Sequence, residues 1–189
     1  MRCNNNEKIR DVGHLSGTLV DLSCSDGCCI NQNGISRLKF LENLFCTDNT
    51  EIKDVNHLSN TLIKLSCGSD CGINQDGISR LKFLKKLDCS DNEKIKDVSH
   101  LKDTLEEFDC SGDNCGICQD GIFQLKIVKK LDCSDNEKIK DVSHLKDTLE
   151  VLDCSWNCGI NQDGISQLKL LKRLVHDGNP KINKNKYIQ

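Results

Sequence analysis

The 189-residue sequence contains no alanine, a single proline and no run of more than four consecutive apolar residues. A membrane-spanning helix needs roughly 20 such residues, so the sequence predicts no membrane span. Basic residues are not in excess either, because 26 Lys and Arg stand against 29 Asp and Glu, a net charge of −3. Nucleic-acid-binding proteins carry a basic footprint that this balance lacks. We therefore expect neither a membrane nor a nucleic acid as a partner.

The sequence is rich in cysteine although it has no alanine. The chain has 14 cysteines, and cysteine behaves as a small buried hydrophobe that fills tight core positions. The segment Met1 to Lys8 has no apolar stretch behind its charge, which predicts that there is no signal peptide. We therefore expect reduced thiols and a cytoplasmic location, in the host cell if the protein is viral, or a place in the virion.

The whole chain is a tandem repeat. Residues 87–106, LDCSDNEKIKDVSHLKDTLE, recur unchanged at 131–150. An apolar-x-Cys motif marks eight turns spaced 21 to 23 residues apart, with cysteines at Cys3, Cys24, Cys46, Cys67, Cys89, Cys110, Cys133 and Cys154. In a ninth turn His176 takes the cysteine position. Two kinds of turn alternate, and periods in this range indicate a solenoid.

The first kind of turn, seen at residues 84–101, has the pattern LxxLxCxxNxxIxxVxxL. It resembles the leucine-rich repeat, LxxLxLxxNxL, with cysteine in the third apolar position. The asparagine position is filled by Asn6, Asn49, Asn92, Asn136 and Asn179. In the second kind, the cysteine is followed by CGINQDGIxxL, as at residues 71–81. The resemblance covers residues 1–182 as one leucine-rich repeat domain, and 183–189 form a C-terminal tail. Composition and repeat style are also similar to leucine-rich repeat proteins of giant DNA viruses that infect amoebae.

We expect an α/β fold, a right-handed solenoid of about nine turns with a parallel sheet on its concave face. Leu and Cys alternate with polar residues in LxxLxC, which is typical of a strand with one buried face. Strands spaced about 4.8 Å apart give a sheet about 40 Å long. On the convex face, residues 76–84 predict a short helix with Asp76 as N-cap, and 97–101 a single helical or 3₁₀ turn. The asparagines should bond the turn backbone.

The cysteines allow a bonded and an unbonded interpretation. Stacked thiols lie within disulfide range, but side chains in a parallel register point into the core, which favours simple core filling. A second group, Cys28, Cys71, Cys115 and Cys158, recurs every 43 or 44 residues, and each could approach the strand cysteine four or five residues before it. Zinc needs four converging ligands, and a CxxC pair occurs once, at Cys115 and Cys118. We expect no metal and no cofactor, with Cys29 and Cys118 as the exposed, oxidisable thiols.

The histidines and the absence of catalytic motifs argue against an enzyme. His14, His57, His100 and His144 recur once per two turns, about 10 Å apart, so they cannot share a metal ion. We interpret them as structural, whereas His176 stands in a core position where an imidazole needs a partner. The chain has no Ser/His/Asp set, phosphate-binding loop or HExxH motif, and every candidate nucleophile is a residue that the repeat duplicates.

One face of the predicted sheet carries a row of acidic residues on four consecutive strands, Asp88, Asp109, Asp132 and Asp153. Like charges on neighbouring strands destabilise a sheet, so this row costs stability unless it is offset. The neighbouring column, with Lys64, Lys86, Glu107 and Lys130, offsets it in part. Two interpretations remain open here: a solvated face amplified by duplication, or a surface that binds a basic protein partner.

The resemblance implies a non-catalytic scaffold for protein–protein interaction through the concave sheet, because leucine-rich repeat proteins are mostly recognition modules. The alternatives are a structural or assembly component of a virion that acts through its ends, and an adaptor fragment of a ubiquitin ligase. Met1 already stands in a strand position, and neither end shows a polar cap. An open sheet edge predicts an end-to-end homodimer or a longer natural protein.

Overall fold

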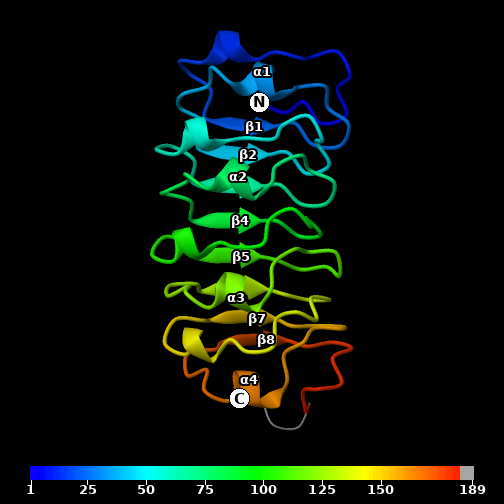
Figure 1. Ribbon diagram of the computed structural model, residues 1–189, viewed down its shortest axis with the longest axis vertical. Helices are drawn as coiled ribbons and strands as arrows, with labels where there is room; N and C mark the ends of the chain where they lie inside the picture. The colour runs from blue at the N-terminus through cyan, green and yellow to red at the C-terminus, as the bar shows by residue number, and fades with distance from the viewer. Residues whose placement is uncertain (184–189) are drawn as a thin grey trace.

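The computed structural model describes residues 1–183, which form a stack of short parallel strands (Figure 1). Eight strands pair in sequence order within one open sheet. They are β1 (Asp21–Ser23), β2 (Asn43–Phe45), β3 (Lys64–Ser66), β4 (Lys86–Asp88), β5 (Glu107–Asp109), β6 (Lys130–Asp132), β7 (Val151–Asp153) and β8 (Arg173–Val175). An isolated parallel bridge between Arg2 and Ser23 fills the strand position of the first turn. The predicted α/β solenoid is confirmed, although Asn183 is the one described residue of the predicted tail and 184–189 lie outside the description.

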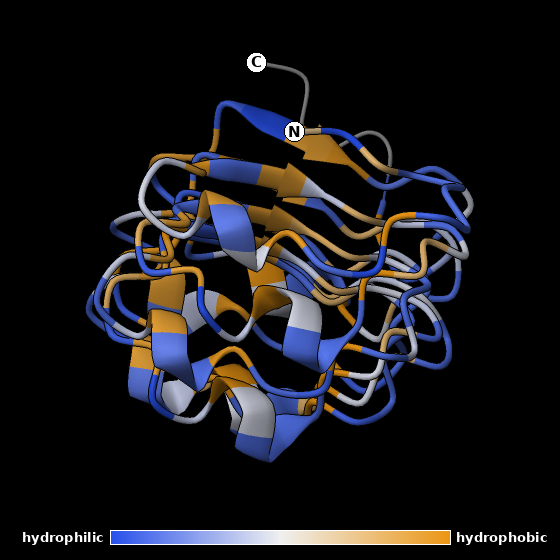
Figure 2. Ribbon diagram, turned by 90° about the horizontal axis from the view of Figure 1, so that it is seen from above, coloured by the Kyte–Doolittle hydropathy of each residue, from blue (hydrophilic) through white to orange (hydrophobic). Residues whose placement is uncertain are grey.

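Two kinds of return segment alternate along the stack, as the two sequence patterns predict. One kind contains a 3₁₀ turn: η1 (Gly13–Leu15), η2 (Asn56–Leu58), η3 (Ser99–Leu101) and η4 (Ser143–Leu145). The other contains a four-residue helix: α1 (Gln32–Ile35), α2 (Gln75–Ile78), α3 (Gln119–Ile122) and α4 (Gln162–Ile165). Seen along the stack, the strands lie on one side and these helical segments on another, with the core between them (Figure 2).

The core is built from the alternation that the strands impose. In β4, Leu87 is buried, whereas Lys86 and Asp88 on either side of it are exposed or half-buried. Because successive side chains of a strand point to opposite faces, the leucine column and the cysteine that follows each strand pack inward. Cys46, Cys67 and the other strand cysteines are all buried. Cysteine therefore fills core positions in this chain, as the missing alanine led us to expect.

The buried asparagines tie neighbouring turns together. The side-chain nitrogen of Asn92 donates to the carbonyl oxygens of Cys67, at 2.7 Å, and Ile73, at 3.2 Å, both in the preceding turn. Its side-chain oxygen accepts from the backbone N–H of Lys94 at 2.9 Å. The equivalent bonds are made by Asn49, Asn136 and Asn179. The predicted role of these asparagines is confirmed.

The prediction that Asp76 caps its helix and that the helix extends to residue 84 was wrong. The helix α2 starts one residue earlier and ends at Ile78, so Asp76 lies inside its first turn. The cap is Asn74, whose backbone is extended and whose side chain accepts from the N–H of Gly77 at 3.0 Å. An N-cap needs this non-helical backbone, which Asp76 does not have. Cys118 occupies the same position before α3 and makes no capping bond.

A glutamine and a glycine set the close spacing of the helical segments. The side-chain oxygen of Gln75 accepts from the N–H groups of Lys96 and Asp97, each at 2.9 Å, and its nitrogen donates to the carbonyl of Asp97 at 2.8 Å. Gly77 packs against the carbonyl oxygen of Lys53, where any Cβ would collide with that backbone. In the segment QDGI, the glutamine is therefore hydrogen-bonded to the following turn, and the glycine packs closely against the preceding turn.

Candidate binding surface on the sheet

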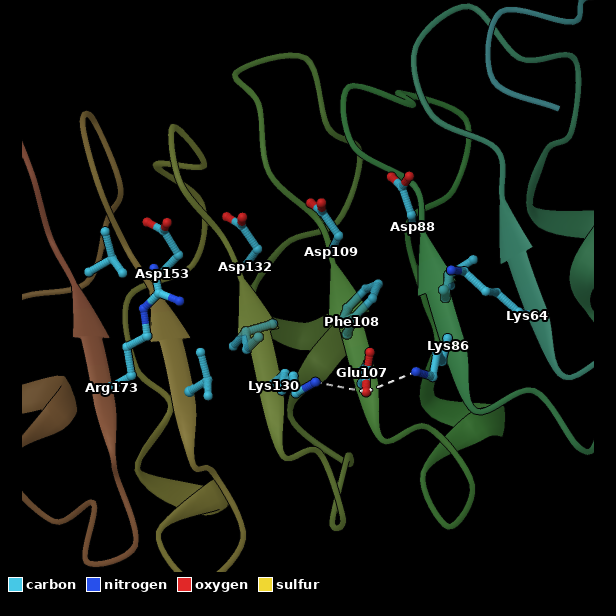
Figure 3. A pocket seen from close by; sticks show the side chains of 14 residues that line it. Lys64, Lys86, Asp88, Glu107, Phe108, Asp109, Lys130, Asp132, Asp153 and Arg173 are labelled. Atoms are coloured by element: carbon cyan, nitrogen blue, oxygen red, sulfur yellow. Dashed lines mark hydrogen bonds and ion pairs between the residues drawn. The ribbon is translucent and has the colours of Figure 1, made fainter. Parts of the chain in front are cut away.

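The four aspartates of the acidic row lie side by side on the outer face of the sheet. The strand register pairs Asp88 with Asp109, Asp109 with Asp132, and Asp132 with Asp153. Each terminates its strand and is half-buried. Figure 3 shows their carboxyl groups aligned along one edge of the strands. The predicted acidic row is therefore a continuous feature of the fold.

Each aspartate is fixed by the residue two positions later. The Oδ1 atom of Asp109 accepts from the backbone N–H of Ser111 at 3.0 Å and from its hydroxyl at 2.6 Å. The same pair of bonds joins Asp88 to Ser90 and Asp132 to Ser134, and Asp153 accepts from the N–H of Ser155. Serine thus orients the carboxyl groups without neutralising them.

In the described part of the chain, the second carboxylate oxygen of three aspartates has no hydrogen-bond partner. The Oδ2 atom of Asp88 accepts from the hydroxyl of Ser66 at 2.7 Å. No hydrogen bond within residues 1–183 reaches the Oδ2 atoms of Asp109, Asp132 and Asp153, and no lysine or arginine of this range forms a salt bridge with any aspartate of the row. Three carboxylate oxygens therefore remain available to a partner along β5, β6 and β7.

Asp109, in the middle of the row, resists ionisation. Partial burial raises the pKa of Asp109 to about 6, and the carboxylates of Asp132 and Asp88 add to this effect. The hydrogen bonds from Ser111 oppose it by stabilising the charged form. The row therefore carries an electrostatic cost that the local serines do not remove.

A second row crosses the same face at the other end of the strands. The register aligns Lys64, Lys86, Glu107 and Lys130, followed by Val151 and Arg173. The Oε1 atom of Glu107 lies 3.0 Å from Lys86 Nζ and 3.1 Å from Lys130 Nζ, as the dashed lines in Figure 3 show. Burial opposes ionisation of Glu107, but the two lysines hold its pKa below the ordinary value. We expected the lysines of this row to offset the negative charge of the acidic row. Lys86 and Lys130 form their ion pairs with Glu107 instead, so neither pairs directly with an aspartate of the acidic row.

A shallow depression runs between the two rows, from β3 to β8. One border is the acidic row, and the other is formed by the row from Lys64 to Arg173. The sheet face is therefore bipolar, with negative charge along the carboxyl ends of the strands and mainly positive charge along the amino ends. A surface of this kind orients a partner as well as attracting it.

The second group of cysteines approaches the strand cysteines of two turns. Cys71 Sγ lies 3.8 Å from Cys46 Sγ, and Cys158 Sγ lies 3.7 Å from Cys133 Sγ. These strand cysteines belong to the preceding turn, 25 residues earlier, and the sequence did not indicate this contact. The reason is the loop path, because the N–H of Gly72 donates to the carbonyl of Asn49 and draws this loop toward the preceding turn. The strand cysteine four residues before, which the sequence did suggest, is also near, because Cys71 adds to the raised pKa of Cys67.

The cysteines are present as free thiols, and 12 of the 14 are buried. Cys29 and Cys118, the two predicted to be most exposed, are the two that are only partly buried. Within residues 1–183 no group of three or more His, Cys, Asp or Glu is arranged to hold a metal ion.

The recurring histidines bind the backbone of the preceding turn. The Nε2 atom of His57 lies 3.1 Å from the carbonyl oxygen of Ile35, and His100 and His144 make the same contact with Ile78 and Ile122. Burial lowers the pKa of these three imidazoles. Their positions therefore serve the stacking of turns, whereas the Nδ1 atom of His176 is buried without a partner.

No protein-family model matches the sequence, and a search of curated proteins finds no significant match. In the described part of the chain, none of the helices is long and apolar enough to span a membrane. The features that bear on function are therefore the two charged rows of the sheet face and the repeat pattern itself.

Proposed function

We propose that this protein is a leucine-rich repeat scaffold without catalytic activity, which binds a basic protein partner through the outer face of its sheet. Support for the family comes from the LxxLxC motif, which recurs in register along the eight-stranded sheet, and from the asparagine that follows the motif in every second turn. Support for binding comes from the site residues Asp88, Asp109, Asp132 and Asp153 with Lys86, Glu107 and Lys130. Fold alone does not assign a function, so the chemistry of this face carries the proposal.

The central observation is the row of unpartnered carboxylate oxygens on Asp109, Asp132 and Asp153. Strands spaced about 4.8 Å apart place these groups close enough to repel one another. The raised pKa of Asp109 reflects that cost together with burial. A partner cation placed over the row offsets this repulsion. Binding of the cation therefore relieves an electrostatic cost that the folded protein carries on its own.

The spacing of the row favours a helical partner. From Asp88 to Asp153 the row spans about 14 Å, three strand intervals. A helix advances about 5.4 Å per turn, so Lys or Arg side chains on successive turns match this interval closely. Same-face residues of a strand are about 6.6 Å apart and fall out of register after two positions. The partner surface is therefore a helix with a basic stripe.

The second row defines the orientation of that helix. Lys64 and Arg173 make no ion pair with Glu107, so the edge of the depression on this side is positive. A neutral or acidic flank of the partner helix fits here, and a second basic stripe is repelled. Complementarity of this type contributes to association rate and specificity more than to raw affinity.

A reducing compartment such as the cytoplasm is also part of the proposal. Its support is the number of cysteines and the close approach of thiols such as Cys46 and Cys71. The similarity to proteins of amoeba-infecting viruses stays a prediction, because no finding bears on the source of the chain.

The experiment is a titration of the isotope-labelled protein with a synthetic lysine-bearing helical peptide, followed by NMR. We expect the largest amide shifts on β4 to β7. The acidic-row variant replaces Asp88, Asp109, Asp132 and Asp153 by Asn, and it should show no saturable shifts. The control variant replaces Asp70, Asp120, Asp163 and Asp177 by Asn, which removes the same charge elsewhere, and it should bind like the wild type. Equal binding by both variants would reduce the row to a solvated surface.

A further inference from the structure

A column of large apolar side chains lies exposed beside the sheet, where each return segment approaches its strand. Phe40 is 54% exposed, Phe83 53% and Leu170 49%, and Ile127 occupies the same repeat position in a half-buried state. They recur every 43 or 44 residues, once per two turns. Large apolar side chains that gather on one surface are typical of an interaction site.

Threonine occupies the same position in the intervening turns. The full column, here called the apolar ladder, reads Thr18, Phe40, Thr61, Phe83, Thr104, Ile127, Thr148 and Leu170. The hydroxyls of Thr61, Thr104 and Thr148 donate to carbonyls three residues earlier, at 3.4 to 3.5 Å, so they require no outside partner. Phe83, Ile127, Thr61 and Thr104 line one hollow. Large and small groups therefore alternate as knobs and holes, with about 4.8 Å per step.

Charged residues flank the apolar ladder with the same alternation. The position before each ladder residue reads Gly17, Lys39, Asn60, Lys82, Asp103, Lys126, Asp147 and Lys169. Lysine precedes every large apolar residue, and aspartate precedes the last two threonines of the column. Among these flanking positions, the described residues form one salt bridge, between Lys126 and Asp103 at 3.1 Å.

We propose that the apolar ladder is a homodimer interface, in which two copies of the chain pack side by side and antiparallel. The two-fold axis passes between Phe83 and Thr104, the central steps of the eight-residue column. Phe83 of each copy then fills the hole at Thr104 of the other, and Phe40 fills the hole at Thr148. At every one of the eight positions of the column, a large side chain of one copy faces a threonine of the other.

The occupant is a second copy because the ladder is complementary to itself. A partner must offer apolar groups every 10 Å with gaps between them, and the ladder has this spacing. The antiparallel register also places Lys82 opposite Asp103 and Lys39 opposite Asp147 of the second copy. An isologous contact of this type closes at two subunits.

The adjoining column gives one favourable and one unfavourable contact. It sets Lys85 opposite Glu106 of the second copy, and Glu42 opposite Glu150. Glu106 already pairs with Lys85 and Lys129 of its own chain, so the favourable contact extends an existing network. The ion pair of Glu150 with Lys172 in its own chain, at 2.8 Å, reduces the repulsion with Glu42. Three columns about 34 Å long bury roughly 1,000 Å² in total, the lower limit for a specific interface. The dimer is accordingly weak and depends on concentration.

The test measures self-association of the full chain by sedimentation equilibrium over a wide concentration range. We expect a monomer–dimer equilibrium whose dissociation constant rises roughly tenfold or more in Phe83→Ser. Phe83 is exposed, so the variant should fold normally. The matched control is Phe123→Ser, because Phe123 is 65% exposed but lies off the ladder, at a position where other turns carry Ser36, Ser79 and Ser166. Its dissociation constant should equal that of the wild type.

The antiparallel register is tested by charge reversal. Lys39→Asp and Asp147→Lys should each weaken the homodimer, because each places like charges opposite one another twice. An equal mixture of the two variants should associate like the wild type, since both contacts in the mixed dimer are then between opposite charges. A chain that remains monomeric at millimolar concentration, oligomers longer than a dimer, or a Phe83→Ser variant with unchanged association would overturn the proposal. A mixture no tighter than the single variants would refute the register.

Discussion

Asn92 Nδ2 lies 2.7 Å from the carbonyl oxygen of Cys67, 25 residues earlier in the chain, and this contact joins two successive turns inside the core. Asn92 is fully buried and also serves the backbone of Ile73 and Lys94. These backbone groups lie where no strand partner is present, so the amide side chain replaces the missing sheet bonds. Each turn is thereby attached to its predecessor by a side chain as well as by strand pairing.

Replacing Asn92 by Ala should lower the free energy of unfolding by about 3 kcal/mol, because two buried carbonyl groups and one partly buried N–H group lose their partner. Asn6 is the control, since it belongs to the first turn and, within residues 1–183, its side chain bonds only the N–H groups of Lys8 and Ile9. Asn6→Ala should cost about 1 kcal/mol. Urea unfolding of both variants gives the comparison, and equal losses would contradict the bridging role.

Cys118→Asn should stabilise the protein by about 1 kcal/mol, because Asn restores the capping bond that α3 lacks. The reverse change, Asn74→Cys, removes the existing bond to Gly77 and should destabilise by a similar amount. Thermal unfolding of the two variants measures both effects. A destabilised Cys118→Asn variant would show that the cysteine packs better than an asparagine caps.

Asp109 should make stability fall as the pH rises from about 4 to about 6. Its pKa is about 6 in the folded protein and about 3.9 in an unfolded chain, so the folded state holds a proton that the unfolded state releases. Above pH 6 the penalty is complete. Asp109→Asn keeps the acceptor for Ser111 and removes this penalty, which should raise stability at pH 7 by about 3 kcal/mol. The difference between wild type and variant should vanish near pH 3, and a difference independent of pH would exclude the shifted carboxyl.

Alkylation without reductant should find the cysteines as thiols, with a strict order of reaction. In the native protein Cys29 and Cys118 should react first, because they alone are partly exposed. In denaturant all 14 should react, as intact-mass measurement will show. Several stable disulfides in protein prepared from a reducing compartment would refute the assignment of the cysteines to core filling.

The sheet and the acidic row were predictable because the strand period is strict. A one-residue slip would turn Leu87 outward and Asp88 inward, so the LxxLxC pattern determines both the register and the face of every strand residue. The buried asparagines were predictable for a related reason, since a polar residue at a fixed place after every second strand has mainly backbone groups near it.

The loops were less predictable, because their contacts depend on how turns stack. Asp76 and Asn74 are both good caps in sequence, and only the backbone at Asn74 decides between them. The pairing of Cys71 with Cys46 depends on the loop being drawn to the preceding turn. The apolar ladder had a clear signal in the sequence, because Phe40 and Phe83 stand at one repeat position. Residues beside a sheet do not alternate between buried and exposed as strand residues do, so the sequence pattern did not indicate that these side chains are exposed.

The affinity of the natural partner for the acidic-row variant tests the central claim most directly. The partner is captured from cells that make the protein, and its binding to the wild type, the acidic-row variant and the control variant is measured by calorimetry at low and high salt. We expect the acidic-row variant to bind roughly tenfold more weakly or worse, and wild-type binding to weaken steeply with salt. Equal affinity of the acidic-row and control variants, with little dependence on salt, would contradict the account.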